Sequence, residues 1–208
     1  MQVTVFGASG KVGKLVVERL LSAGHTVTVF VHYNSPFIPS EQLKIIKSDV
    51  HNAAFVEAAV RGSDAVISTL GSWHTPTKDV LSAAMRFIIP AMQQSHVHRI
   101  ITVTGSGALV PADKPSFGAR IQHAVIGIVA KDVLRDSEMH LQLLADSGLA
   151  WTCVRSPAMR DGEAGAYRLT AVPPKPWERV SRAAVADALV AQLTELDWLQ
   201  AAPHIHQS

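Results

Sequence analysis

Several features are scarce in this chain of 208 residues, and each scarcity narrows what the protein does. It has one cysteine, Cys153, so an internal disulfide framework is excluded and a reducing compartment is expected. Cys153 lies in the apolar run 151–154, which predicts a buried structural thiol rather than a nucleophile. The formal net charge is only +2 and no Lys/Arg-rich run is present, so the sequence predicts no nucleic-acid partner.

Long apolar runs are also absent. No stretch approaches the roughly 18 apolar residues that would span a membrane, so no membrane partner is expected. Residues 1–6 lack the basic leader and the long apolar core of a signal peptide, which predicts a cytoplasmic protein. No repeat or low-complexity segment divides the chain, so we expect a single domain over 1–208. The sequence leaves monomer and homodimer open.

What the chain does have is a regular alternation of short apolar runs and helical patterns. Alternation of strands and helices predicts an α/β protein with a Rossmann-type, doubly wound parallel sheet in three layers (α/β/α). The residues after the sixth strand leave room for a small C-terminal cap. Strands are predicted at 3–6, 26–31, 43–46, 65–70, 99–104, 150–154 and 204–206. Helices are predicted at 11–23, 53–60, 75–94, in a long region ending near 146, and at 181–193.

The first strand leads directly into a glycine-rich loop with the spacing G-x-x-G-x-x-G. Glycine allows a tight turn and lets the backbone approach a diphosphate, and the following helix offers free N–H groups and a partial positive charge. This context, with a strand before and a helix after, is the one that a dinucleotide-binding loop requires. The loop predicts a nicotinamide dinucleotide site at Gly7, Ser9, Gly10, Lys11, Val12 and Gly13.

The residues after the second strand bear on the choice of cofactor. Sites that prefer NAD usually place Asp or Glu about 20 residues past the glycines, on the ribose 2′-hydroxyl. Here the region reads Val31-His32-Tyr33-Asn34, and the next carboxylate is Glu41. Because a carboxylate would repel a 2′-phosphate, its absence favours NADP over NAD, with Lys11 and His32 as the candidate phosphate contacts. The alternative for His32 is an exposed loop residue.

These motifs together resemble the atypical short-chain dehydrogenase/reductase group, the NAD(P)H-binding proteins similar to NmrA and to biliverdin-IXβ/flavin reductase. The resemblance covers most of the chain. Besides the glycine loop, it rests on Ser48-Asp49-Val50, Ser68-Thr69-Leu70-Gly71, Thr104-Gly105-Ser106 and the segment from Ser147 to Pro157.

The resemblance implies roles for the matching positions. Asp49 and Val50 are expected against the adenine, and Leu70 and Gly71 along the ribose and diphosphate. Pro157, Ala158 and Met159 are expected at the nicotinamide end, with Ser106 beside the nicotinamide and facing the substrate, and Thr104 is expected among the cofactor-binding residues. Family members often carry Arg after the second strand, where this chain has His32. Asp49 is also a candidate helix cap before Ala53, a role compatible with adenine binding.

A Tyr-x-x-x-Lys pair, the usual proton donor for carbonyl reduction, is missing. Tyr33 is followed at that spacing by Phe37, and Tyr167 by Ala171. Hydride transfer does not require this tyrosine, because the cofactor supplies the hydride and a flavin or quinone takes its proton from water. Such an acceptor is expected between Trp73, His74, Ser106 and the segment 107–118, whose Pro and Gly residues predict a mobile lid. Trp73 is equally readily interpreted as a packing residue under that lid.

Other clusters carry less. His96-x-His98 and His204-x-His206 lack a third ligand at a known spacing, so no metal site is predicted. His140 is expected at the surface of its helix. Asp136 and Ser137 lie where the family shows polar residues near the substrate, but they complete no catalytic motif.

The leading hypothesis is an NAD(P)H-dependent oxidoreductase that passes hydride to a flavin or quinone. The alternatives are a non-catalytic dinucleotide-binding redox sensor of the NmrA type and, less favoured, a nucleotide-sugar-type epimerase.

Overall fold

The central element of the computed structural model, which describes residues 1–73, 75–110, 113 and 117–207, is an eight-stranded sheet. Its strand order is β3-β2-β1-β4-β5-β6-β10-β8, and the first six strands are parallel in the order typical of Rossmann folds. Only β8 at the edge runs antiparallel to its neighbour. The strands are β1 (Gln2–Phe6), β2 (Thr26–Val31), β3 (Leu43–Lys47), β4 (Ala65–Ser68), β5 (Arg99–Gly105), β6 (Ala150–Ser156), β8 (Tyr167–Thr170) and β10 (His204–Gln207).

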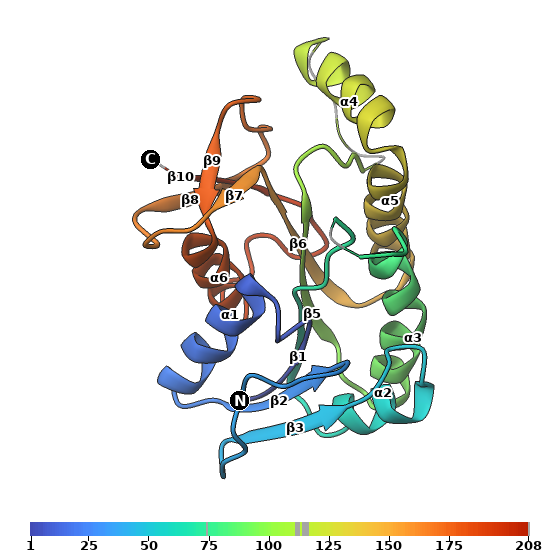
Figure 1. Ribbon diagram of the computed structural model, residues 1–208, viewed down its shortest axis with the longest axis vertical. Coiled ribbons are helices and arrows are strands. Elements are labelled where there is room, and N and C mark those ends of the chain that lie inside the picture. Colours follow the sequence, from blue (N-terminus) through green and yellow to red (C-terminus); the bar gives the residue numbers. More distant parts are fainter. Residues whose placement is uncertain (74, 111–112, 114–116, 208) are drawn as a thin grey trace.

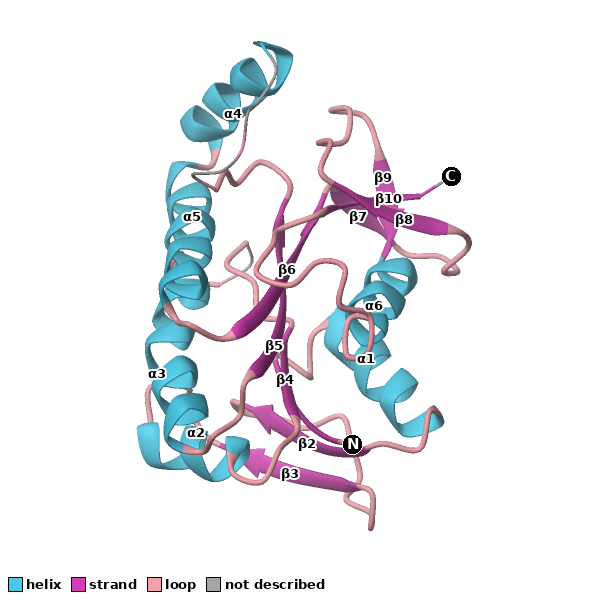
Figure 2. Ribbon diagram, turned by 180° about the vertical axis from the view of Figure 1, so that it is seen from behind, coloured by secondary structure: helices cyan, strands magenta, loops and turns pink. Residues whose placement is uncertain are grey.

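Helices cover both faces of this sheet, which confirms the predicted three-layer α/β fold (Figure 1). One face carries α1 (Lys11–Ser22) and α6 (Arg182–Ala191), which pack on each other. The opposite face carries α2 (Ala53–Val60), α3 (Val80–Gln94) and α5 (Lys131–Asp146), as Figure 2 shows from behind. The remaining helix, α4 (Phe117–Val129), projects beyond the end of α5. Among the described residues, no helix combines the length and the apolarity needed to cross a bilayer.

Alternating side chains in the strands feed two separate hydrophobic cores. Val5 and Val29, which are register partners on β1 and β2, pack in the core under α1 and α6. The next pair along the same strands, Phe6 and Phe30, packs in the core under α2, α3 and α5. Both faces of a covered parallel sheet must be apolar, which explains the nearly continuous β-branched runs that the strand predictions relied on.

The chain after β6 builds the predicted small cap. Two short strands, β7 (Ala158–Arg160) and β9 (Arg179–Ser181), pair in parallel as a second sheet. The excursion between them contains β8, which joins the main sheet through β10 (Figure 1). The Ser181 side chain accepts a hydrogen bond from the Ala184 N–H at 3.0 Å and so caps α6.

Three predicted boundaries were wrong. The helix expected to start at Thr75 and Pro76 begins at Val80, because its first N–H groups are bonded by a carboxylate from α5 rather than by a local cap. The strand expected to reach residue 70 ends at Ser68. The long helical region after 118 is broken at Ala130 into α4 and α5. The helix α3 is continuous through Pro90.

Candidate cofactor and acceptor site

The glycine loop between β1 and α1 is packed too closely for side chains at two positions. Gly7 has φ +74°, and a Cβ there would lie 2.8 Å from the backbone nitrogen of Leu70. A Cβ on Gly13 would lie 2.2 Å from the Gly7 carbonyl oxygen. The Thr69 hydroxyl fixes the approach by donating to the carbonyls of Phe6 and Gly7, both at 3.1 Å. The glycines therefore hold the ends of β1 and β4 and the start of α1 in one tight crossing.

The N-terminus of α1 has the properties of an anion site. Gly10 occupies the N-cap without a side chain to bond the first-turn N–H groups, and that turn contains no acidic residue. Ser9, Gly10 and Lys11 are exposed. A helix start with free N–H groups, a partial positive charge and a lysine in its first turn suits a diphosphate. The loop and the helix together fit the phosphates of a dinucleotide.

The cap reaches this loop through an exposed carboxylate. Asp161 lies 3.6 Å from Lys11 Nζ and 2.6 Å from Arg182 Nη1, measured between the charged atoms. Both ion pairs involve a largely exposed Asp161, so they contribute little to stability. They do place two cations, one from the loop and one from α6, at the same edge of the site.

The residues expected at the adenosine end form a small polar cluster after β2 and β3. The His32 Nε2 lies 3.1 Å from Asp49, and the His51 Nδ1 lies 2.6 Å from the other carboxylate oxygen. The His51 backbone N–H and side chain, together with His32, lower the pKa of Asp49. Tyr33 packs on the His32 ring with centroids 3.8 Å apart. Val50 beside them is half-buried against the α2–α3 core.

Asp49 is not the helix cap that its position suggested. Asn52 occupies the N-cap of α2, and its side chain makes no capping bond. Asp49 instead accepts from the His51 N–H at 2.8 Å, which closes a turn one step before the helix.

A cavity of about 560 Å³ extends from the glycine loop to α5 and the cap. Its size falls in the range of about 300–1,000 Å³ that small-molecule sites occupy. It gathers residues from the ends of β5 and β6 and from the segments that follow β4, β5 and β6, as expected where parallel strands end. The predicted residues on its wall are Val12, Leu70, Gly71, Trp73, Thr104, Ser106, Pro157 and Met159. The other predicted residues do not line it: Gly7, Ser9, Gly10, Lys11, Gly13, His32, Asp49 and Val50. His74 lies outside the described residues.

Thr104 and Ser106 form the wall at the end of β5. Thr104 is buried, and among the described residues its hydroxyl has no hydrogen-bond partner. A buried hydroxyl on a cavity wall without a partner is suited to bond a ligand. Ser106 is held by its backbone N–H, which donates to the Ser156 carbonyl at 2.8 Å. These positions fit the carboxamide end of a nicotinamide.

The opposite wall depends on a buried carboxylate that sequence reasoning left without a role. Asp136 on α5 accepts from the N–H groups of Leu81 and Ser82 at 3.0 and 2.8 Å, so it caps α3 from a distant helix. The Ser72 hydroxyl also donates to Asp136. Ser72 and Ser137, next to Asp136 in sequence, both line the cavity. The sequence signal for this arrangement was the polar pair Asp136 and Ser137 in the middle of an amphipathic helix. That signal could not identify the partners of Asp136, which lie more than 50 residues away in the sequence.

The mouth of the cavity lies between the β4–α3 loop and the cap. Trp73 on one side is 62% exposed, so it is not the buried packing residue that we considered as the alternative. Lys175, Pro176 and Arg182 line the other side. The Lys175 Nζ lies 5.7 Å from the centroid of the exposed Trp177 ring. Nothing in the local sequence marked Lys175, because the cap is brought to the site only by the pairing of β7 with β9.

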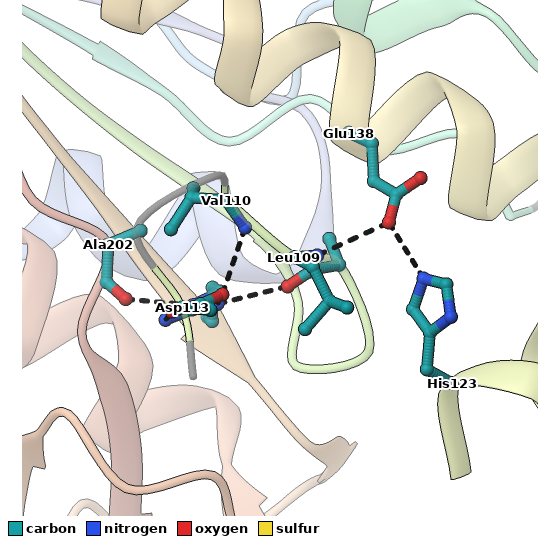
Figure 3. Close-up of polar contacts among 8 residues, drawn as sticks. Leu109, Val110, Asp113, His123, Glu138 and Ala202 are labelled. Atoms are coloured by element: carbon teal, nitrogen blue, oxygen red, sulfur yellow. Dashed lines mark hydrogen bonds and ion pairs between the residues drawn. The ribbon is translucent and has the colours of Figure 1, made fainter. Parts of the chain in front are cut away.

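The segment after β5, predicted as a lid, is anchored wherever it is described (Figure 3). Arg155 on β6 is buried and forms an ion pair with Asp113, with a second contact at 3.0 Å from Nη2. Burial by itself raises the pKa of Asp113, but Arg155 and the Val110 N–H outweigh it, and the pKa is lowered. Glu138 on α5 accepts from the Leu109 N–H at 3.4 Å. Residues 111–112 and 114–116 lie outside the described residues.

Two further side chains, His140 and Cys153, are buried but do not line the cavity. His140 is fully buried on α5, which corrects its expected surface position, and neither ring nitrogen has a partner among the described residues. Burial lowers its pKa to about 4. Burial raises the pKa of Cys153 to about 12, in keeping with a structural thiol. No cluster of three or more His, Cys, Asp or Glu side chains suited to a metal is found in the part of the chain that the structure describes.

Several solved structures have the same fold as this chain. A solved short-chain dehydrogenase/reductase from Veillonella parvula in complex with NADP has 18% identity and a TM-score of 0.79, over 99% of this chain and 94% of that one. A putative NADH-flavin reductase from Streptococcus pneumoniae has 23% identity and a TM-score of 0.77 over the whole of both chains. These likenesses establish the fold.

A relative from Mycobacterium tuberculosis is 28% identical over 85% of this chain, which spans only 17% of that relative's length. The model of the NAD(P)H-binding family matches residues 7–196, from the first loop glycine to beyond α6. The chain therefore belongs to the NAD(P)H-binding family.

Proposed function

We propose that this protein is an NADPH-dependent oxidoreductase that passes hydride to a small conjugated acceptor of the flavin or quinone type. The observation that carries the proposal is the single cavity that continues from Val12 on the phosphate loop, past Thr104 and Pro157, to a wall on α5. A nicotinamide seated between Thr104 and Pro157 leaves the α5 end free for a second ring. That arrangement supports hydride transfer between two stacked rings.

The chain's own residues bind and orient in this scheme. The loop N–H groups would hold the diphosphate, and Thr104 would bond the carboxamide. When bound, the reduced nicotinamide supplies a hydride, so the acceptor gains two electrons and one proton from it and takes a second proton from water. Ser106 lines the same cavity as Thr104 and would contact the nicotinamide or an acceptor oxygen, which makes it the candidate catalytic residue. No tyrosine acid is needed for such an acceptor.

Preference for NADP over NAD is part of the proposal. His32 is exposed at the end of β2, and the first carboxylate after it in the same loop is Glu41, nine residues further on. Asp49 is close to His32, but it is engaged by the backbone and the ring of His51. His32 is therefore the candidate partner of a 2′-phosphate, with Lys11 as a second cation from the loop.

The test is turnover with a panel of acceptors. Purified protein is mixed with NADPH and a series of flavins and quinones, and absorbance at the nicotinamide band is followed. Turnover above the uncatalysed rate supports the proposal. Tight NADPH binding without turnover of any acceptor contradicts it and favours a redox sensor. Gly10→Asp is the matched control, because a carboxylate at the helix start repels the diphosphate while the φ of −69° at Gly10 suits any residue.

A further inference from the structure

Two hydroxyl groups on the inner wall of the cavity have their hydrogens already committed. The Ser72 hydroxyl donates to Asp136, and the Ser137 hydroxyl donates to the Val133 carbonyl at 2.8 Å. Both serines are buried and both line the cavity. A serine hydroxyl has one hydrogen and two lone pairs, so each presents only lone pairs to a ligand. The inner wall is therefore an acceptor of hydrogen bonds.

The orientation of Ser72 is fixed by the way α3 begins. Asp136 accepts from the Leu81 N–H through Oδ2 and from the Ser82 N–H through Oδ1, and the Ser72 hydroxyl is the donor in its bond to Oδ2. A ligand that offers carbonyl oxygens alone, as a quinone does, would meet lone pairs at this wall and leave polar groups on both sides unpaired. A ligand with a ring N–H can donate a hydrogen bond to the lone pairs of these hydroxyls.

The outer end of the cavity carries positive charge, so it favours a negatively charged group on the ligand. Lys175 is exposed at the mouth, and no ion pair of its ammonium group is found among the described residues. Arg182, the other cation there, is paired with Asp161. The Glu178 carboxylate is near enough to feel the Lys175 charge but forms no ion pair with it among the described residues, because it accepts from the Lys175 backbone N–H at 3.1 Å and lies 3.0 Å from the His206 ring. Lys175 is thus the cation that a ligand's negative group would meet.

We propose that the acceptor is a planar ring system with a ring N–H edge, bound against Ser72 and Ser137, and an anionic substituent, bound by Lys175. The inference rests on the proposed function and narrows it, because a flavin phosphate satisfies both ends of the cavity and a neutral quinone satisfies neither. Ser72 and Lys175 are specificity-determining residues in this assignment, and Asp136 is a positioning residue that acts through Ser72.

The experiment pairs three ligands with two variants. Flavin mononucleotide, riboflavin and N3-methylriboflavin differ in turn by the phosphate and by the ring N–H. We expect wild-type kcat/KM with NADPH to be highest for flavin mononucleotide. In Lys175→Gln the preference for flavin mononucleotide over riboflavin falls about fivefold, mostly through KM, and in Ser72→Ala the preference for riboflavin over the N3-methyl compound falls about tenfold. Lys44→Gln, on exposed β3, is the control and leaves both preferences unchanged.

Each variant is expected to change only one of the two preferences, and this distinguishes the recognition of one ligand group from a general structural effect. A general loosening of the site would lower turnover of all three flavins together, whereas recognition moves one ratio in each variant. Equal kcat/KM for the three flavins in the wild type, or faster turnover of menadione than of any flavin, overturns the inference and leaves the proposed oxidoreductase function standing.

If no acceptor is reduced, the proposed function fails, and binding is measured instead by quenching of flavin fluorescence in the presence of NADP. Tighter binding of flavin mononucleotide than of riboflavin, lost in Lys175→Gln, then supports the recognition of an anionic ring ligand. Equal binding of both flavins overturns it.

Discussion

The two ends of the cavity are built in different ways. The phosphate end comes from one continuous segment, 7–13, which reaches the cavity at Val12 and depends on backbone atoms and on glycines without side chains. The acceptor end is assembled from side chains of the β4–α3 loop, α5 and the cap, such as Ser72, Ser137 and Lys175, which are far apart in sequence.

The difference teaches where specificity resides in this molecule. A loop that binds through N–H groups accepts any dinucleotide diphosphate, because the backbone is the same whatever the ligand's other end. A wall that binds through oriented hydroxyls and a lysine discriminates among acceptors. The first end is expected to be intolerant of added atoms, and the second to change preference when its side chains change.

The largest effect is expected at the phosphate end. Gly13→Ala puts a Cβ 2.2 Å from the Gly7 carbonyl, a backbone atom that cannot yield without opening the crossing of β1 and α1. We expect NADPH affinity to fall at least about 100-fold in a fluorescence titration. Gly127→Ala is the control, since a Cβ in α4 meets only the end of Leu134 at 3.7 Å. Unchanged affinity in a folded Gly13→Ala variant would refute the assigned loop.

The acceptor end is expected to depend on the buried ion pair that anchors the segment after β5. Arg155→Met leaves the Asp113 carboxylate without its partner, and we expect a loss of about 3 kcal/mol of unfolding free energy in urea. The double variant Arg155→Met/Asp113→Leu is expected to recover part of this loss, because no charge is then left unpaired. A single variant as stable as the wild type would show that the segment is anchored elsewhere.

A smaller effect, on the pH dependence of stability, is expected from His140 on α5, the helix that carries Asp136. The folded pKa of His140, about 4, lies below its ordinary value of 6.5, so the unfolded chain binds this proton first as the pH falls. Stability linked to His140 is therefore complete above about pH 6.5 and is lost between there and pH 4. Between pH 7 and pH 5, the free energy of unfolding measured in urea is expected to fall about 1–2 kcal/mol less in His140→Leu than in the wild type. Identical pH profiles would contradict the buried neutral histidine.

The smallest effect concerns cofactor choice at the adenosine end. His32→Asp adds a carboxylate beside Asp49 and removes the candidate phosphate partner, so we expect the NADP/NAD ratio of binding constants to fall about tenfold. His32→Asn, which removes the cation without adding a charge, is expected to have a smaller effect. An unchanged ratio in both variants would remove His32 from the selection of NADP.

The positions of the strands and of the loop were predictable because they depend on local patterns. The apolar runs around Val5, Val29 and Ile67 predicted strands, and the glycine spacing predicted the β1–α1 crossing, which the structure confirms. The start of α3 was not predictable, because its cap comes from Asp136 rather than from Thr75. His140 was misplaced because the period of a helix shows which residues share a face but not whether a second helix covers it.

The amino-acid sequence alone determined the α/β fold and the dinucleotide loop, since both follow from periodicity and from residues adjacent in the chain. Only the tertiary structure decided the acceptor end. It brought Ser72 to Asp136 and Lys175 to the mouth of the cavity, and these contacts join segments separated by 64 residues in the first case and by a paired cap in the second. The physical reason is that hydrogen-bond direction and burial arise from packing between distant segments, which local sequence does not encode.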